Sequence, residues 1–254
     1  MPSNVDYDLW CGPADQEPIC RPKLHYDWHW DYNTGAGDMG NQGIHQMDIA
    51  RWFLGEDQLP PRVLSIGGRV GYEDCGESAN TQLVYCDYPN APLQFDTRGL
   101  PSSRARWSDW GRSMDSYRGS QIGVIVQCDG GHLYAPNTYD VVTAYDTSGR
   151  LIKEFKRGGD HYANFLSAVS AGDDSMVKGN VTEGHVSSAL CHLGNESHQL
   201  GREATAGELP SELASNELLG AAFDRMADHL RANKTETAAR PSCGASGSTY
   251  GPKP

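Results

Sequence analysis

The middle of the chain constrains the fold most, because it holds a series of short β-type segments separated by few residues. Turn-forming residues punctuate it at Asn90, at 129–131 and at 148–149. A parallel crossover needs about a dozen residues, whereas most of these connections are shorter and several suit hairpins. We therefore predict mainly antiparallel pairing. The predicted strands span 62–72, 80–88, 92–99, 120–129, 131–137, 140–146 and 151–156.

Helical periodicity is confined to the two sides of this β-rich region. Apolar residues recur every three or four positions in 43–54, 160–172, 183–202 and 212–233. The order of helix, strands and helices indicates an α+β fold with an open, mostly antiparallel sheet. We expect the helices to pack on one face of that sheet.

Residues 1–40 are irregular, with an aromatic run followed by glycines. Residues 233–254 are small and polar, which predicts a flexible tail. We therefore expect one domain over residues 1–232.

The chain is acidic, with 33 Asp and Glu against 21 Lys and Arg and a formal net charge of −12. This charge disfavours binding to nucleic acid or to an anionic membrane. No apolar run is long enough to span a bilayer, and the N-terminal residues lack the pattern of a secretory signal. The seven cysteines are scattered and form no CxxC pair, which favours free thiols and a cytoplasmic location. No histidine cluster has the spacing of a zinc site.

Asn41 and His45 are four residues apart near the start of the first predicted helix, so we expect them to share one helix face. The positive end of the helix dipole favours a neutral imidazole there, which suits a base that takes a proton from a hydroxyl group. Asp48 follows three residues later and could orient His45 or face away. We predict catalytic roles for His45 and Asn41 and a substrate contact for Asp48.

The aromatic run supplies further candidates for substrate binding, namely Trp28, His29, Trp30 and Tyr32. Indole faces can stack on the C–H face of a sugar ring while polar neighbours bind its hydroxyls. The alternative is an apolar plug beneath a long loop. Asp38, in the glycine-rich segment that follows, is included among the expected substrate ligands.

That glycine-rich segment, residues 35–40, matches the spacing G-x-G-x-x-G. A dinucleotide site would require a buried strand before it and a parallel strand after the helix. Neither is expected here, which favours a loop that needs unusual backbone angles.

Asp160 and His161 open the helix predicted at 160–172. Asp160 can cap that helix, and we also predict a supporting catalytic role for the pair.

Four stretches together, 6–14, 24–55, 158–169 and 183–202, resemble the Gfo/Idh/MocA oxidoreductase family. The resemblance covers residues 5–232 and implies the substrate and oligomerisation domain of that family. Members of the family begin with a Rossmann domain, and we expect this chain to start after it. In the family's Asp-x-x-x-His signature, His45 takes the His position while Asn41 replaces the Asp.

The resemblance leaves three functional expectations. The first is an NAD-independent glycoside hydrolase with acid–base chemistry at His45. The second is the detached substrate domain of an NAD(P)-dependent sugar oxidoreductase that needs a separate Rossmann subunit. The third is a non-catalytic module for sugar binding or oligomerisation. In each case we expect a sugar or glycoside ligand, no cofactor or metal bound by this chain alone, and a homo-oligomer formed through the free face of the sheet.

Overall fold

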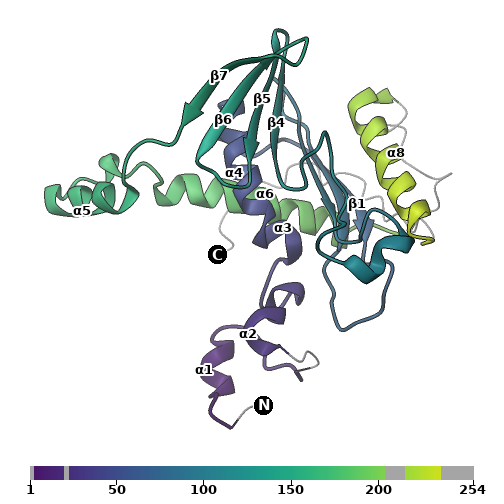
Figure 1. Cartoon of the computed structure of the whole chain (residues 1–254). Helices are drawn as coiled ribbons and strands as arrows, with labels where there is room; N and C mark the ends of the chain where they lie inside the picture. Colours follow the sequence, from purple (N-terminus) through teal and green to yellow (C-terminus); the bar gives the residue numbers. More distant parts are fainter. Residues whose placement is uncertain (1–2, 20–22, 204–214, 236–254) are drawn as a thin grey trace. The chain divides into compact units, whose positions relative to one another are not determined.

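The computed structural model describes residues 3–19, 23–203 and 215–235 (Figure 1). The chain divides into two compact units, each of which is described separately. The first unit comprises Met1–Ile44, Pro60–Asp115 and Cys191–Pro254, and the second comprises His45–Leu59 and Ser116–Leu190. The predicted tail lies outside the described residues from position 236 onward, as do Cys20 and Cys243.

The first unit is built on a three-stranded antiparallel sheet with the order β1-β2-β3. Its strands are β1 (Val63–Gly68), β2 (Thr81–Cys86) and β3 (Leu93–Arg98). Ile66 pairs with Leu83, and Leu64 pairs with Tyr85. Because side chains alternate along a strand, these four apolar residues lie on the same face of the sheet.

Helix α8 (Glu217–Ala232) packs on that face (Figure 1). The side chain of Asn216 caps the helix by accepting a hydrogen bond from the Leu219 backbone N–H at 3.1 Å. The apolar stripe predicted for this helix is confirmed, because the apolar residues that recur along it, from Leu219 to Leu230, are all buried. The resulting core contains Leu64, Ile66, Leu83, Tyr85, Leu100, Leu219, Ala222, Phe223, Met226 and Leu230.

The opposite face of the same sheet is also covered. The part of α6 (Val181–Gln199) that belongs to this unit approaches β2 closely at Gly194. A Cβ atom at Gly194 would lie 3.1 Å from Val84 and 3.2 Å from Met39. The Ser197 hydroxyl donates to the Val63 carbonyl oxygen at 3.1 Å. Helices therefore cover both faces of this sheet, which departs from the one-sided arrangement expected.

The second unit contains a four-stranded antiparallel sheet with the order β4-β5-β6-β7. Its strands are β4 (Gly123–Cys128), β5 (Gly131–Pro136), β6 (Val141–Asp146) and β7 (Leu151–Lys156). The unit also contains most of α4 (Gly43–Leu54), all of α5 (His161–Ala171) and the first part of α6. Every residue of β7 is exposed.

The predicted α+β class with open antiparallel sheets is therefore confirmed. The seven predicted strands form two sheets rather than one, because residues 99–122 separate β3 from β4 and include the 3₁₀ helix η2 (Arg104–Asp109).

Several short helices lie in the segment predicted to be irregular. They are α1 (Tyr7–Cys11), α2 (Leu24–Asp27), η1 (Trp28–Trp30) and α3 (Gly37–Asn41), and a further 3₁₀ helix, η3, spans Asp174–Met176. Each has at most five residues, which is too short for an apolar period to show in the sequence.

Among the described residues, no helix is both long and apolar enough to cross a membrane. All five cysteines in this part of the chain are free thiols, and burial raises the pKa of Cys86 and of Cys191 to about 12.

Candidate functional site

The two residues predicted to form the catalytic pair lie on different helices. Asn41 is the last residue of α3, and Gln42 separates it from Gly43, where α4 begins. Both Asn41 and His45 are exposed. The expected single helix with both side chains on one face is therefore broken at Gln42.

His45 lies beside Tyr139, which sequence reasoning did not single out. The two ring centroids are 5.3 Å apart, with the ring planes tilted by 33°. Tyr139 occupies the turn between β5 and β6 and has a φ of +57°. A bulky residue in this left-handed region is uncommon and is held there by its surroundings.

Two hydrogen bonds fix the hydroxyl of Tyr139. It accepts one from Gln46 Nε2 at 2.9 Å and donates one to Asn137 Oδ1 at 2.6 Å. The ring is thereby tied both to α4 and to its own turn, and it lies beside the exposed imidazole of His45. The only signal in the sequence was a tyrosine at a position where hairpin turns favour small residues.

Asp48 belongs to a different cluster. Its carboxylate accepts a hydrogen bond from Ser187 Oγ at 2.5 Å and lies 3.7 Å from Arg51 Nη2. Arg51 is buried and also binds Ser187 Oγ at 3.0 Å, the Glu56 carbonyl oxygen at 2.7 Å and the carboxylate of Glu183. These contacts join α4 to the start of α6, while the predicted substrate contact of Asp48 stays a prediction.

Asp160 and His161 make local contacts at the start of α5. Asp160 caps the helix by accepting from the backbone N–H groups of Tyr162 and Ala163. His161 Nδ1 lies 3.1 Å from Arg157 Nη2. Within the described part of the chain, no hydrogen bond, ion pair or ring contact joins this pair to His45. The helix cap is thus observed, whereas the supporting catalytic role stays a prediction.

The aromatic run gathers three of the predicted substrate ligands. His29 is buried, and its Nδ1–H donates to the Tyr26 carbonyl oxygen at 2.5 Å. Its ring lies 3.9 Å from the ring of Trp30, centroid to centroid. Asp38, on the first turn of α3, receives a hydrogen bond from the side chain of Trp30.

Arg69 completes this cluster from the end of β1. Burial raises the pKa of Asp38, although the charge of His29, the Trp30 hydrogen bond and the charge of Arg69 act in the opposite direction. The guanidinium of Arg69 also binds both carboxylate oxygens of Asp74 at 2.5 Å each. Sequence reasoning missed Arg69 because it lay within a predicted strand.

The glycine-rich segment packs against the chain itself. Gly37 has a φ of +64°, and a Cβ atom there would lie 2.5 Å from the Ser78 side chain. A Cβ atom at Gly35 would lie 2.4 Å from the Cα atom of His29. The described strands pair only antiparallel, and a 3₁₀ helix precedes the glycines where a dinucleotide site needs a strand. These residues therefore do not fit a nicotinamide nucleotide.

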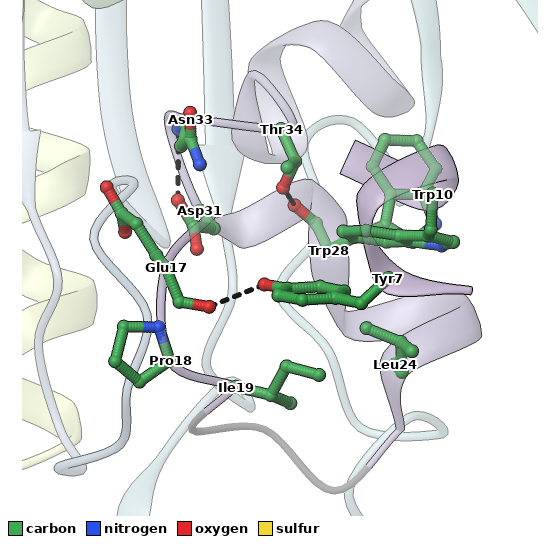
Figure 2. A pocket seen from close by; sticks show the side chains of 10 residues that line it. All are labelled: Tyr7, Trp10, Glu17, Pro18, Ile19, Leu24, Trp28, Asp31, Asn33 and Thr34. Atoms are coloured by element: carbon green, nitrogen blue, oxygen red, sulfur yellow. Dashed lines mark hydrogen bonds between the residues drawn. The ribbon is translucent and has the colours of Figure 1, made fainter. Parts of the chain in front are cut away.

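Trp28 borders this cluster, because its ring lies edge-on to that of His29 with the centroids 5.8 Å apart. Trp28 is 40% exposed and also lines a pocket with residues of the N-terminal segment (Figure 2). The backbone N–H of Tyr32 donates to Glu77 Oε2 at 3.0 Å.

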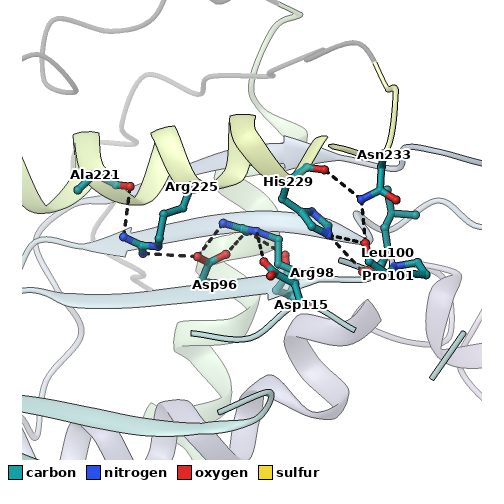
Figure 3. A network of polar contacts seen from close by, with 10 residues as sticks. Asp96, Arg98, Leu100, Pro101, Asp115, Ala221, Arg225, His229 and Asn233 are labelled. Carbon is teal, nitrogen blue, oxygen red and sulfur yellow. Dashed lines mark hydrogen bonds and ion pairs between the residues drawn. The ribbon is translucent and has the colours of Figure 1, made fainter. Parts of the chain in front are cut away.

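A further polar network lies where α8 meets β3 (Figure 3). His229 Nε2 lies 3.0 Å from the Pro101 carbonyl oxygen and 3.2 Å from that of Leu100. Arg98 pairs with Asp96 and lies 4.0 Å from Asp115. Because its charges are matched and its partners come from the core elements, we assign this network to packing of α8. Within the described chain, no group of three or more His, Cys, Asp or Glu residues is placed to hold a metal ion.

The two antiparallel sheets and their helices define an α+β fold. Comparison with known families makes this more specific, because residues 1–93 match the Gfo/Idh/MocA model described as the oxidoreductase family, C-terminal alpha/beta domain. The resemblance to the C-terminal domain of the Gfo/Idh/MocA family is therefore confirmed over this segment. No curated protein matches the chain.

Solved structures of oxidoreductases are also similar to the chain. A protein from Klebsiella pneumoniae described as an oxidoreductase is 14% identical, with 73% of this chain and 53% of that chain covered and a TM-score of 0.42. A protein from Desulfitobacterium hafniense, described as an NADPH-dependent oxidoreductase, is 11% identical, with 68% of this chain and 49% of that chain covered and a TM-score of 0.45. A protein from Bacillus cereus described as an oxidoreductase is 16% identical, with 72% of this chain and 51% of that chain covered and a TM-score of 0.36. The chain spans about half the length of these proteins.

One functional expectation is overturned. The matching family is one of oxidoreductases, so the assignment as a glycoside hydrolase is wrong. It had rested on the expectation that a chain without a nucleotide site of its own must use hydrolytic acid–base chemistry. The family match instead supports the alternative, a domain of an oxidoreductase.

Proposed function

We propose that the chain is the substrate domain of an NAD(P)-dependent sugar oxidoreductase, with the nucleotide held by a Rossmann domain outside these residues. The observation that carries the proposal is the match of residues 1–93 to the C-terminal domain of an oxidoreductase family. A nicotinamide nucleotide would supply the hydride acceptor or donor. The contribution of this chain is to bind the sugar and to move the proton of the reacting hydroxyl.

His45 is the proposed proton acceptor. Its imidazole is exposed at the first turn of α4, so a substrate hydroxyl can approach it. Tyr139 acts as a positioning residue, because its ring lies against the imidazole while two hydrogen bonds hold its hydroxyl. Asn41 cannot take a proton, and its proposed role is to bind a substrate hydroxyl.

His29, Trp30 and Asp38 are the proposed sugar contacts of the first unit. They bring two ring systems and a carboxyl group together, and Arg69 adds a guanidinium. Such a mixture of ring faces with hydrogen-bonding groups suits a polyhydroxylated ring. Asp160 and His161 are not among the proposed sugar contacts, because the contacts they make are local to the start of α5.

The direct test combines the chain with a separately produced Rossmann domain of the family and follows nicotinamide reduction over a panel of sugars. We expect turnover only with both parts present. His45→Ala should reduce kcat strongly, whereas His185→Ala, which removes an exposed histidine elsewhere in the same unit, should not. Sugar binding without turnover under any combination would favour the non-catalytic module instead.

We also propose that the chain forms a homo-oligomer through the second unit. Leu151, Ile152 and Phe155 of β7 are exposed. The helix that follows, α5, exposes Phe165, Leu166 and Val169 by 58%, 63% and 61%. An apolar surface of this kind favours a protein partner, and a second copy of the chain is the occupant we propose.

A further inference from the structure

The N-terminal segment of the first unit encloses a pocket that the proposed function does not use (Figure 2). It is open to solvent and has a cavity volume of about 40 Å³. The aromatic side chains of Tyr7, Trp10 and Trp28 lie on one side of it in this view, and Glu17 and Asp31 lie on the other. Pro18, Ile19 and Leu24 add apolar surface.

The aromatic side of the pocket is preorganised. The rings of Tyr7 and Trp10 stack with their centroids 5.7 Å apart and their planes 21° apart. The hydroxyl of Tyr7 donates to the Glu17 carbonyl oxygen at 2.5 Å, which fixes the ring across the pocket. Aromatic faces carry partial negative charge and attract cations.

Apart from the indole N–H groups of Trp10 and Trp28, the side-chain hydrogen-bond donors that line the pocket are committed to the chain itself. Asn33 Nδ2 donates to the Asp15 carbonyl oxygen at 2.8 Å, and Asn33 Oδ1 accepts from the Asp15 N–H at 3.0 Å. The Thr34 hydroxyl donates to the Trp28 carbonyl oxygen at 2.8 Å. The polar surface left to a ligand is therefore dominated by acceptors.

Those acceptors are carboxylates. Asp31 uses one oxygen, Oδ1, to accept from the Asn33 N–H at 2.9 Å, and its second oxygen remains for a ligand. Among the described residues that line the pocket, Glu17 adds a second acid, and none is a lysine or an arginine. Residues 1–34 as a whole carry six acidic and two basic side chains.

We infer that this pocket binds an organic cation, namely a substituted ammonium group with methyl or methylene carbons on its nitrogen. The aromatic faces and the apolar residues contact those carbons, while Asp31 and Glu17 balance the charge. A neutral sugar would need donors as well as acceptors, and the lining supplies few. The inference concerns a site separate from His45 and does not rest on the proposed function.

The test compares choline with 3,3-dimethyl-1-butanol, which has the same shape without the charge. Each is titrated into the full chain while the backbone and indole N–H signals are followed by NMR. We expect choline to shift the signals of the pocket residues with a dissociation constant on the order of millimolar, and the neutral alcohol to bind at least five-fold more weakly.

Variants locate the site. Trp10→Ala, Glu17→Gln and Asp31→Asn should each weaken choline binding by about three- to ten-fold. Trp52→Ala and Asp224→Asn, which change an exposed tryptophan and an exposed aspartate elsewhere, should leave binding unchanged. Circular dichroism checks that each variant is folded, and the conservative Glu17→Gln and Asp31→Asn keep the test valid if Trp10→Ala unfolds.

Three results would overturn the inference. Equal binding of the neutral alcohol would make the pocket simply apolar. Choline binding that none of the pocket variants weakens would place the cation elsewhere. Absence of choline binding, or glucose binding at these residues in its place, would exclude a cation site, and neither result would bear on nicotinamide reduction at His45.

Discussion

The guanidinium of Arg225 on helix α8 lies 3.9 Å from the carboxylate of Asp96 on strand β3 (Figure 3). Asp96 also pairs with Arg98, its neighbour two positions along the strand. Burial nevertheless raises the pKa of Asp96 to about 6, against the effect of both arginines, and Asp115 acts in the same direction as burial. The contact between α8 and the sheet therefore depends on pH.

The sign of this effect follows from proton binding. A carboxyl group with a raised pKa in the folded state binds its proton more tightly there than in the unfolded chain. Its contribution to stability is therefore lost as pH rises from about 4 through 6. Wild type should therefore lose stability relative to Asp96→Asn between about pH 4 and pH 6. Thermal unfolding of both proteins across this range tests it, and a constant difference would contradict it.

Protonation of His229 should affect stability in the opposite direction from protonation of Asp96. Burial lowers its pKa, although Asp115 and the carbonyl groups of Pro101 and Leu100 oppose the change. The unfolded chain then binds the proton more tightly, so stability falls as pH drops below the ordinary range of histidine. His229→Gln should flatten that loss between pH 7 and pH 5. The exposed His192 provides the control, because His192→Gln should leave the profile as it is in wild type.

Gly37 tests the packing of the glycine-rich segment. Gly37→Ala adds a Cβ atom 2.5 Å from the Ser78 side chain at a φ of +64° and should lower the free energy of unfolding by about 2–4 kcal/mol. Gly172→Ala meets a similar φ of +63° with no atom within 4 Å and should cost about 1 kcal/mol. Adding Ser78→Gly to Gly37→Ala should recover part of the loss in chemical denaturation. Equal costs at the two glycines would show that crowding is unimportant.

Arg51 tests the cluster that joins α4 to α6. Arg51→Ala leaves Asp48 and Glu183 without their shared cation, and a loss of about 2–3 kcal/mol is expected because both carboxylates keep some exposure. Asp48→Asn should cost less, since the amide can still accept from Ser187. Urea denaturation measures both losses. A larger effect for Asp48→Asn would mean that the aspartate has a role beyond this cluster.

The proposed oligomer gives a prediction of its own. Phe165→Lys and Leu166→Lys place charges on the exposed face of α5 and should shift the chain to a monomer in size-exclusion chromatography with light scattering. Leu9→Lys, which changes an exposed leucine in the first unit, should not. A wild-type chain that is monomeric at all concentrations would refute the proposal.

Local patterns in the sequence predicted most of the regular structure. The seven strands lie within their predicted ranges, and the helix at 43–54 matches α4. The stripe at Leu219, Phe223 and Met226 is buried as expected. The stripe of α5 is different, because Leu166 and Val169 are apolar at helical spacing and yet exposed. Periodicity reports which face of a helix is apolar, and it cannot report what covers that face.

The candidate site was only partly predictable. His29, Trp30 and Asp38 were selected from a short aromatic and glycine-rich stretch, and they do meet. In the first unit, Arg69 was missed because it lay within a predicted strand. In the second unit, Tyr139 was missed because it is distant from His45 along the chain. The roles of the ten predicted site residues, the single domain over 1–232 and the cytoplasmic location stay predictions.

The sequence by itself determined the α+β class, the antiparallel pairing and the relationship to an oxidoreductase family, because strand length, turn spacing and motif identity are local properties of the chain. Only the tertiary structure decided that the strands divide into two sheets, that Asp48 binds Ser187 139 positions away, and that Tyr139 lies beside His45. Such contacts depend on how distant segments pack, and a residue's partners across the fold are not encoded in its neighbours along the chain.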